Sequence, residues 1–140
     1  MKTASVYAYA RRHGHIIVNM PYKKERSIAV QLPGGQCCIG IDREKLTTSS
    51  EENAALLHEL GHCETGAFYS RFSPVDDRGK CEEAANRWAV KKALTYRKLL
   101  RAMRSGFTES YQLAEYFGVT EEMIRKAYAY YTEACGLKFR

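Results

Sequence analysis

The sequence has no apolar run that approaches the roughly 20 residues needed for a helix that spans a bilayer. Its first residues also lack the continuous apolar segment of an export signal, because Arg11 and Arg12 fall where that segment would lie. Internal repeats and low-complexity linkers are missing, and the composition, 45% hydrophobic and 27% charged, is that of a globular protein. These absences argue against a membrane-spanning or disordered protein, and we expect a cytoplasmic location.

Cysteine is present, but not in a zinc-finger pattern. None of the five cysteines belongs to a Cys-x-x-Cys pair, so a zinc knuckle or ribbon is unsupported. An odd number of cysteines without an export signal predicts reduced thiols. Cys63 and Cys81 are expected to be buried and inert, with a redox switch as the alternative.

Positive charge exceeds negative charge, and the net charge is +6. The excess is concentrated in residues 91–104, which read KKALTYRKLLRAMR. Such a stretch can meet nucleic acid or an acidic partner. We expect instead a helix face exposed to solvent.

The order of the hydrophobic patterns predicts an α+β fold in a single domain over residues 1–140. We divide it into a helix plus a small sheet (1–48), zinc-binding helices (49–105) and C-terminal helices (106–140). The predicted strands are residues 15–20, 27–32 and 37–41, and short connections between them suggest an antiparallel sheet. The predicted helices are residues 4–13, 49–66, 80–104, 108–117 and 120–131, with a loop over 67–79. Ser49 with Glu52 fits a capping box, and Thr120 fits an N-cap.

The strongest chemical signal is the segment His58-Glu59-Leu60-Gly61-His62. On a helix, residues four positions apart lie on one face, about 6 Å apart along the axis, so both imidazoles can reach one Zn²⁺. Glu59 lies roughly 100° around the helix from His58. It therefore flanks the two histidines, where a general base that activates water is needed. The alternative is a pair of surface histidines without a metal.

A catalytic zinc needs a third protein ligand and leaves one position open. Glu82 and Asn86 are four residues apart in the next predicted helix and share a face. Glu82 can supply the third ligand, and Asn86 can hydrogen-bond a ligating histidine and fix its tautomer. Glu83, Cys81 and Glu64 are alternative ligands.

Three segments resemble the ImmA/IrrE family of zinc peptidases, in particular its short members from prophages and integrative elements: HELGHCETGAFY, CEEAANRWAVKKAL and LAEYFGVTEEMIRKAY. The resemblance covers residues 49–131. It implies a zincin-like core of the gluzincin type, Zn²⁺ as the cofactor, His58, His62 and Glu82 as its ligands, and Glu59 as the base. It places Asn86 beside a ligand where many relatives have Asp, so the histidine that it contacts would gain less basicity.

Members of this family typically cleave a helix-turn-helix repressor encoded beside them. The resemblance therefore implies a zinc endopeptidase whose protein substrate is a repressor of the same mobile element. The alternative is a non-catalytic regulator that binds a repressor or DNA and uses the metal structurally. Structural zinc sites usually have four protein ligands, and a fourth is not evident here.

Two further features would suit a peptidase. Tyr69, just past the motif, is a candidate donor to the oxyanion, with a packed aromatic ring as the alternative. A sheet edge, for which we take residues 37–41, could hold an extended peptide by strand addition. His13 and His15 stand apart from the motif and are expected to be structural.

The segment 112–128 has the spacing of a helix-turn-helix, with Ala114 and Gly118 at characteristic positions. Its second helix would begin with Glu121 and Glu122, and two carboxylates there repel DNA phosphates. We therefore expect a helix-turn-helix-like segment that does not bind DNA directly.

Overall fold

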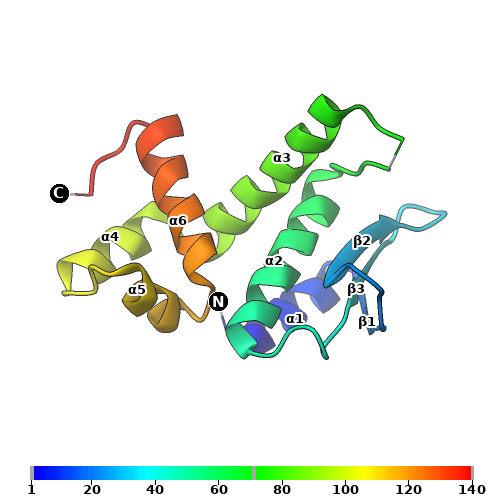
Figure 1. Cartoon of the computed structure of the whole chain (residues 1–140), viewed down its shortest axis with the longest axis horizontal. Helices are drawn as coiled ribbons and strands as arrows, with labels where there is room; N and C mark the ends of the chain where they lie inside the picture. Colours follow the sequence, from blue (N-terminus) through cyan, green and yellow to red (C-terminus); the bar gives the residue numbers. More distant parts are fainter. Residues whose placement is uncertain (1, 71, 140) are drawn as a thin grey trace.

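The computed structural model describes residues 2–70 and 72–139, and it confirms an α+β fold (Figure 1). In chain order the elements are α1 (Thr3–Arg12), β1 (Ile16–Asn19), β2 (Ser27–Gln31), β3 (Cys37–Ile41), α2 (Ser49–Thr65), α3 (Val75–Ala93), α4 (Tyr96–Arg104), α5 (Ser110–Phe117), α6 (Glu121–Ala129) and the π-helical turn η1 (Tyr130–Ala134). Within the described part of the chain, no helix has both the length and the apolar character that crossing a bilayer requires.

The sheet has three strands in the order β1-β3-β2, and it is mixed. Strand β2 runs antiparallel to β3, with Ser27 opposite Ile41, but β1 runs parallel to β3, with Ile16 opposite Cys38. The prediction of an antiparallel sheet was therefore wrong for the β1–β3 pair. It assumed that consecutive strands pair, whereas β3 lies between the two strands that precede it.

The central position of β3 follows from its composition. Its sequence CCIGI is buried at every position except Cys38, which is partly buried. An apolar strand suits the middle of a sheet, where neighbouring strands pair both of its edges and keep them from solvent. The expectation that residues 37–41 form a free edge was therefore wrong, and β2 is an outer strand of the sheet.

Helix α2 is fixed at both ends by its own sequence. The side chain of Thr48 accepts a hydrogen bond from the backbone N–H of Glu51, so Thr48 is the N-cap and the predicted cap, Ser49, is the first helical residue. Gly66 ends the helix in the left-handed conformation, with φ of 68°. Between these caps, α2 carries the whole His-Glu-x-x-His segment on one continuous helix.

Residues 80–104 were predicted to form one helix, and they form parts of two. Helix α3 begins after Pro74. The negative charges of Asp76 and Asp77 in its first turn interact favourably with the positive N-terminal end of the helix dipole. Leu94 then leaves the helical conformation, with φ of −126°, and Thr95 caps α4 by accepting from the N–H of Lys98. Helix α3 therefore includes residues that we had placed in the loop 67–79.

Helix α2 lies between the sheet and α3 (Figure 1). Its Leu56, Leu57 and Leu60 are fully buried together with Ile39 and Ile41 of β3. Burial of each such side chain contributes about 1.5–3 kcal/mol. The His-Glu-x-x-His segment thus lies on a helix anchored in the hydrophobic core.

The packing of α2 on β3 also brings two cysteines together. Cys37 and Cys63 are 26 residues apart in sequence, but their Cα atoms are 5.8 Å apart and their sulfur atoms form a disulfide. The prediction of reduced thiols was wrong for this pair, because the contact depends on tertiary packing. Cys38, Cys81 and Cys135 are free thiols.

The C-terminal helices α5 and α6 are joined by a short turn at Gly118, and Thr120 caps α6 as predicted. Helix α6 packs against α3, and its basic side chains Arg125 and Lys126 pair with Glu121 and Glu122 of the same helix. The charged side chains of α4 face solvent, as expected for the basic stretch: Arg97, Lys98, Arg101 and Arg104.

Candidate metal centre

The side chains of His58, His62 and Glu82 converge on one point between α2 and α3. The two histidine Nε2 atoms are 3.2 Å apart. The carboxylate oxygens of Glu82 lie 2.7 Å from Nε2 of His58 and 3.3 Å from Nε2 of His62. All three potential ligand atoms lie within 4.8 Å of one another, so one metal ion can contact all three.

The contacts of the two Nδ1 atoms indicate the tautomer of each histidine. Nδ1 of His58 is 2.8 Å from Oδ1 of Asn86, and Nδ1 of His62 is 2.6 Å from the carbonyl oxygen of Ala67. Both partners are oxygen acceptors, so in the neutral ring, the form that binds a metal, each Nδ1 carries the hydrogen and each Nε2 presents a lone pair. In that form, two lone pairs and a carboxylate face one another, and a cation among them relieves their repulsion. The residues therefore fit a divalent metal ion with nitrogen and oxygen ligands.

Glu59 lies beside this cluster and is buried, with 6% of its surface exposed. The hydroxyl of Ser27, on β2, donates a hydrogen bond of 2.6 Å to Oε2 of Glu59. Burial raises the pKa of Glu59, and the negative charge of Glu82 adds to this effect, while Ser27 and the two histidines oppose it in part. A carboxylate with a raised pKa is a better proton acceptor near neutral pH than an exposed one.

Tyr69 contacts Glu82, the carboxylate of the cluster. Its hydroxyl donates a hydrogen bond of 2.6 Å to Oε1 of Glu82. This bond, together with burial, raises the pKa of Tyr69 to about 12, so the hydroxyl stays protonated at neutral pH. Burial acts to raise the pKa of Glu82, but the hydrogen bond from Tyr69 and the charges of His58 and His62 outweigh it and lower that pKa. Glu82 is therefore held as a carboxylate.

A cleft of about 320 Å³ opens over the cluster. One wall is β2, which contributes Ile28, Ala29 and Val30, and the loop after α2 contributes Phe68 and Tyr69. The floor carries the two histidines, Glu59 and Glu82. The strand beside the cluster is thus β2, not β3.

The other side chains that we considered as third ligand point elsewhere. Glu83 is exposed and forms an ion pair of 2.6 Å with Arg87. The thiol of Cys81 lies 3.6 Å from the carbonyl oxygen of Phe68. Glu64 lies on the opposite side of the motif, 3.1 Å from His13 and 3.1 Å from His15, so these two histidines do not stand alone as expected.

Three contributors to the site were missed by the sequence reasoning: Ser27, Gly61 and the carbonyl of Ala67. Ser27 is one of many serines, and nothing in its neighbourhood marks it. Gly61 lies inside the motif, and its role depends on the neighbouring helix. The Ala67 carbonyl is a backbone group, and only the path of the loop brings it to His62.

Two imidazoles four residues apart on a helix, a carboxylate from the next helix and a buried carboxylate beside them form the site of a metal-dependent hydrolase. The comparison with protein families agrees: the profile described as the IrrE N-terminal-like domain, peptidase M78, matches residues 10–128. The chain therefore belongs to the ImmA/IrrE family of metallopeptidases. No curated protein and no solved structure matches it significantly.

Asn86 is expected to tune the metal affinity through His58. Asn86→Ala removes the acceptor that orients the imidazole, and losses of this kind typically weaken metal binding about 10–100-fold. Asn86→Asp keeps an acceptor and adds charge, so it should bind the metal at least as tightly as the wild type. Competition titration with a chelating dye measures both, with Arg87→Ala as a control on the same helix. Equal affinities in all four proteins would show that packing alone orients His58.

Gly61 is expected to set the distance between α2 and α3. A Cβ at this position would lie 2.3 Å from the carbonyl oxygen of Ala85, so Gly61→Ala must push the helices apart. We expect a loss of about 1–3 kcal/mol in unfolding free energy, typical of overpacking, and weaker metal binding because Glu82 moves with α3. Thermal denaturation and metal titration measure these effects. The control is Gly79→Ala on α3, where a Cβ meets nothing within 4 Å. If the two variants behave alike, close helix contact is not required.

Proposed function

We propose that this protein is a zinc-dependent endopeptidase that cleaves a helix-turn-helix repressor encoded by the same mobile element. The observation that carries the peptidase reading is the convergence of His58, His62 and Glu82 beside the buried Glu59, at the floor of an open cleft. The identity of the substrate rests on the family resemblance.

We assign zinc because two imidazoles and one carboxylate are the ligand set of many catalytic zinc sites, with the fourth position left for water or substrate. His58, His62 and Glu82 would hold the ion. When bound, Zn²⁺ lowers the pKa of water to about 7 and polarises a carbonyl oxygen.

The chain's own residues supply the proton transfers. Glu59 accepts a proton from the attacking water and delivers it to the leaving amine. The hydrogen bond from Ser27 fixes Oε2 of Glu59, so the other carboxylate oxygen, Oε1, is the one that can take the proton. Removal of Glu59 from bulk water, at 6% exposure, raises its pKa and so favours the protonated state that the second transfer requires.

The substrate is proposed to bind as an extended strand along β2. This outer strand forms one wall of the cleft, and Val30 is 43% exposed there. Backbone hydrogen bonds to a sheet edge hold a peptide without reading its sequence, while side-chain pockets give selectivity. Tyr69 lines the same cleft and stays protonated, which supports a role as donor to the oxyanion.

The remaining organisation belongs to the same proposal. Residues 1–140 would act as a single catalytic domain in the cytoplasm, where a repressor meets DNA. Helices α5 and α6 would be part of that domain and would not bind DNA. The support for this is the packing of α6 on α3 and the pairing of Arg125 and Lys126 with neighbouring glutamates.

The test is incubation of the zinc-loaded protein with the purified repressor from the same element. Mass spectrometry should find cleavage at one or few peptide bonds, and a chelator should prevent it. If the repressor is inactivated without any fragment and the chelator has no effect, the protein is a binding regulator.

A further inference from the structure

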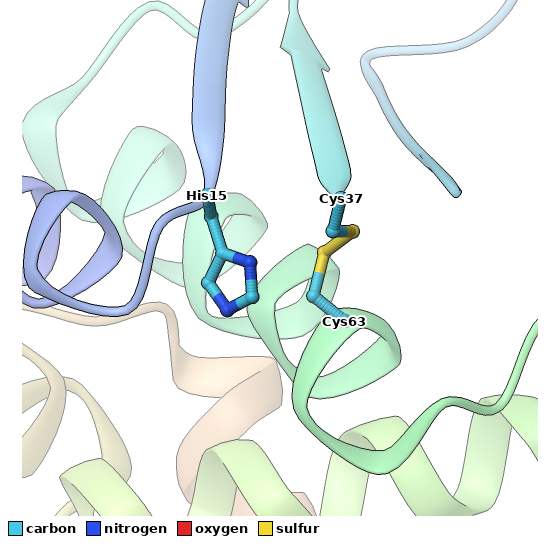
Figure 2. Close-up of side chains that lie close together, drawn as sticks. All are labelled: His15, Cys37 and Cys63. Carbon is cyan, nitrogen blue, oxygen red and sulfur yellow. A yellow bond between two sulfur atoms is a disulfide. The ribbon is translucent and has the colours of Figure 1, made fainter. Parts of the chain in front are cut away.

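A second group of metal-ligating side chains lies at the other side of α2 from the candidate metal centre. His15 precedes β1, Cys37 begins β3 and Cys63 lies on α2, and their potential ligand atoms lie within 4.8 Å of one another. Figure 2 shows the His15 ring directed at the two sulfur atoms, which form a disulfide in this structure. The group shares no residue with the cluster of His58, His62 and Glu82.

The state of the His15 ring indicates a ligand. Its Nε2 lies 3.1 Å from Oε1 of Glu64, so Nε2 carries the hydrogen and Nδ1 has a lone pair. Nδ1 is buried, and within the described residues it has no hydrogen-bond partner. In Figure 2 the ring edge that carries Nδ1 faces the sulfur atoms. A histidine that donates to a carboxylate through one nitrogen and offers the other to a metal is the usual arrangement at metal sites.

We propose that His15, Cys37 and Cys63 form a redox-gated site for a thiophilic metal ion of the zinc class. The ion binds when the two cysteines are reduced and leaves when they are joined. Two thiolates and one imidazole are a known zinc ligand set that leaves one position open, and they disfavour Mg²⁺ and Ca²⁺. Two sulfur ligands on one tetrahedral zinc are about 3.8 Å apart, given Zn–S bonds of about 2.3 Å. Cα atoms 5.8 Å apart allow this spacing as well as the disulfide.

The chemistry of the gate is a two-electron exchange. A dithiol reductant gives two electrons and two protons to the Cys37–Cys63 bond, which breaks into two thiols while the reductant becomes a disulfide. Both thiols lose their protons to solvent as two sulfur–metal bonds form. In the reverse direction, the two sulfur–metal bonds break, the sulfur atoms of Cys37 and Cys63 give up two electrons and join as a disulfide, and the ion leaves with its charge unchanged. A small-molecule disulfide accepts these two electrons, takes up two protons and becomes two thiols.

Cobalt(II) distinguishes the two sites, because only a site with thiolate ligands gives a thiolate-to-cobalt charge-transfer band in the near ultraviolet. The 140-residue chain is reduced with a phosphine under anaerobic conditions and titrated with Co²⁺, then with Zn²⁺. We expect the band to appear on reduction, to vanish when Zn²⁺ displaces Co²⁺, and to be absent from oxidised protein. Zinc content should rise by about one ion per chain on reduction.

Matched variants assign the band to its ligands. Cys63→Ser and His15→Ala should each weaken cobalt binding at this site at least about tenfold, whereas Cys38→Ser and Cys81→Ser should leave the band unchanged. Circular dichroism of each variant establishes that it is folded. Absence of the band in reduced wild type, or its persistence in folded Cys63→Ser, overturns the proposal. Neither result bears on the peptidase activity, because that depends on the other cluster.

Discussion

Replacing Glu59 with Gln is expected to slow cleavage of the repressor about 10²–10⁴-fold, the usual contribution of a general base. Gln is nearly isosteric with Glu, and its amide oxygen can still accept the hydrogen bond from Ser27. It cannot take up a proton. Glu59 is not one of the three residues whose ligand atoms converge, so the variant should keep its fold and its zinc.

The measurement is a time course of fragment formation with elemental analysis of the same preparation. Glu83→Gln is the matched control, since Glu83 lies one position from Glu82 but is exposed and paired with Arg87. That control should cleave like the wild type. If Glu59→Gln cleaves at the wild-type rate, the base is another group. If it has lost its zinc, Glu59 is a ligand.

Removing a ligand should abolish tight metal binding at the candidate centre. His62→Ala and Glu82→Ala are each expected to weaken zinc binding more than about 100-fold, which exceeds the loss typical of a residue that only orients a ligand. Glu82→Ala leaves the two imidazoles of α2 without a metal ligand from α3. The protein should be studied with the Cys37–Cys63 disulfide intact, so that the measurement reports one site.

Zinc titration of Glu82→Ala and Glu83→Ala makes the comparison, because both changes remove one carboxylate from the same turn of α3. We expect about one zinc per chain in the wild type and in Glu83→Ala. The reverse order, with zinc lost only from Glu83→Ala, would mean that α3 presents its other glutamate to the metal.

Local helix geometry made the core of the site predictable. Two histidines four residues apart share a face of any helix, so the pairing of His58 with His62 needed no tertiary information. The same holds for the N-cap of α6 at Thr120 and the end of α2 at Gly66, which depend on side chains and φ angles within a few residues. The α+β class and the family followed from these local patterns together with the resemblance.

Tertiary structure decided which residues from other elements contact the residues of α2. Glu82 was one of several acidic or thiol candidates in the sequence, and it reaches the histidines because α3 packs closely on α2 at Gly61 and Ala85. Ser27 reaches Glu59 because β2 is the strand beside α2.

The direction of β1 and the Cys37–Cys63 disulfide have the same origin. Each depends on which segments, distant in sequence, bury their apolar faces together, and β3 is buried by β1, β2 and α2 at once. A pattern of residues reports which face of an element is apolar. The pattern does not report which other element will pack on that face. Many pairings of helices and strands bury a similar apolar area, and the packing of the whole chain selects one of them.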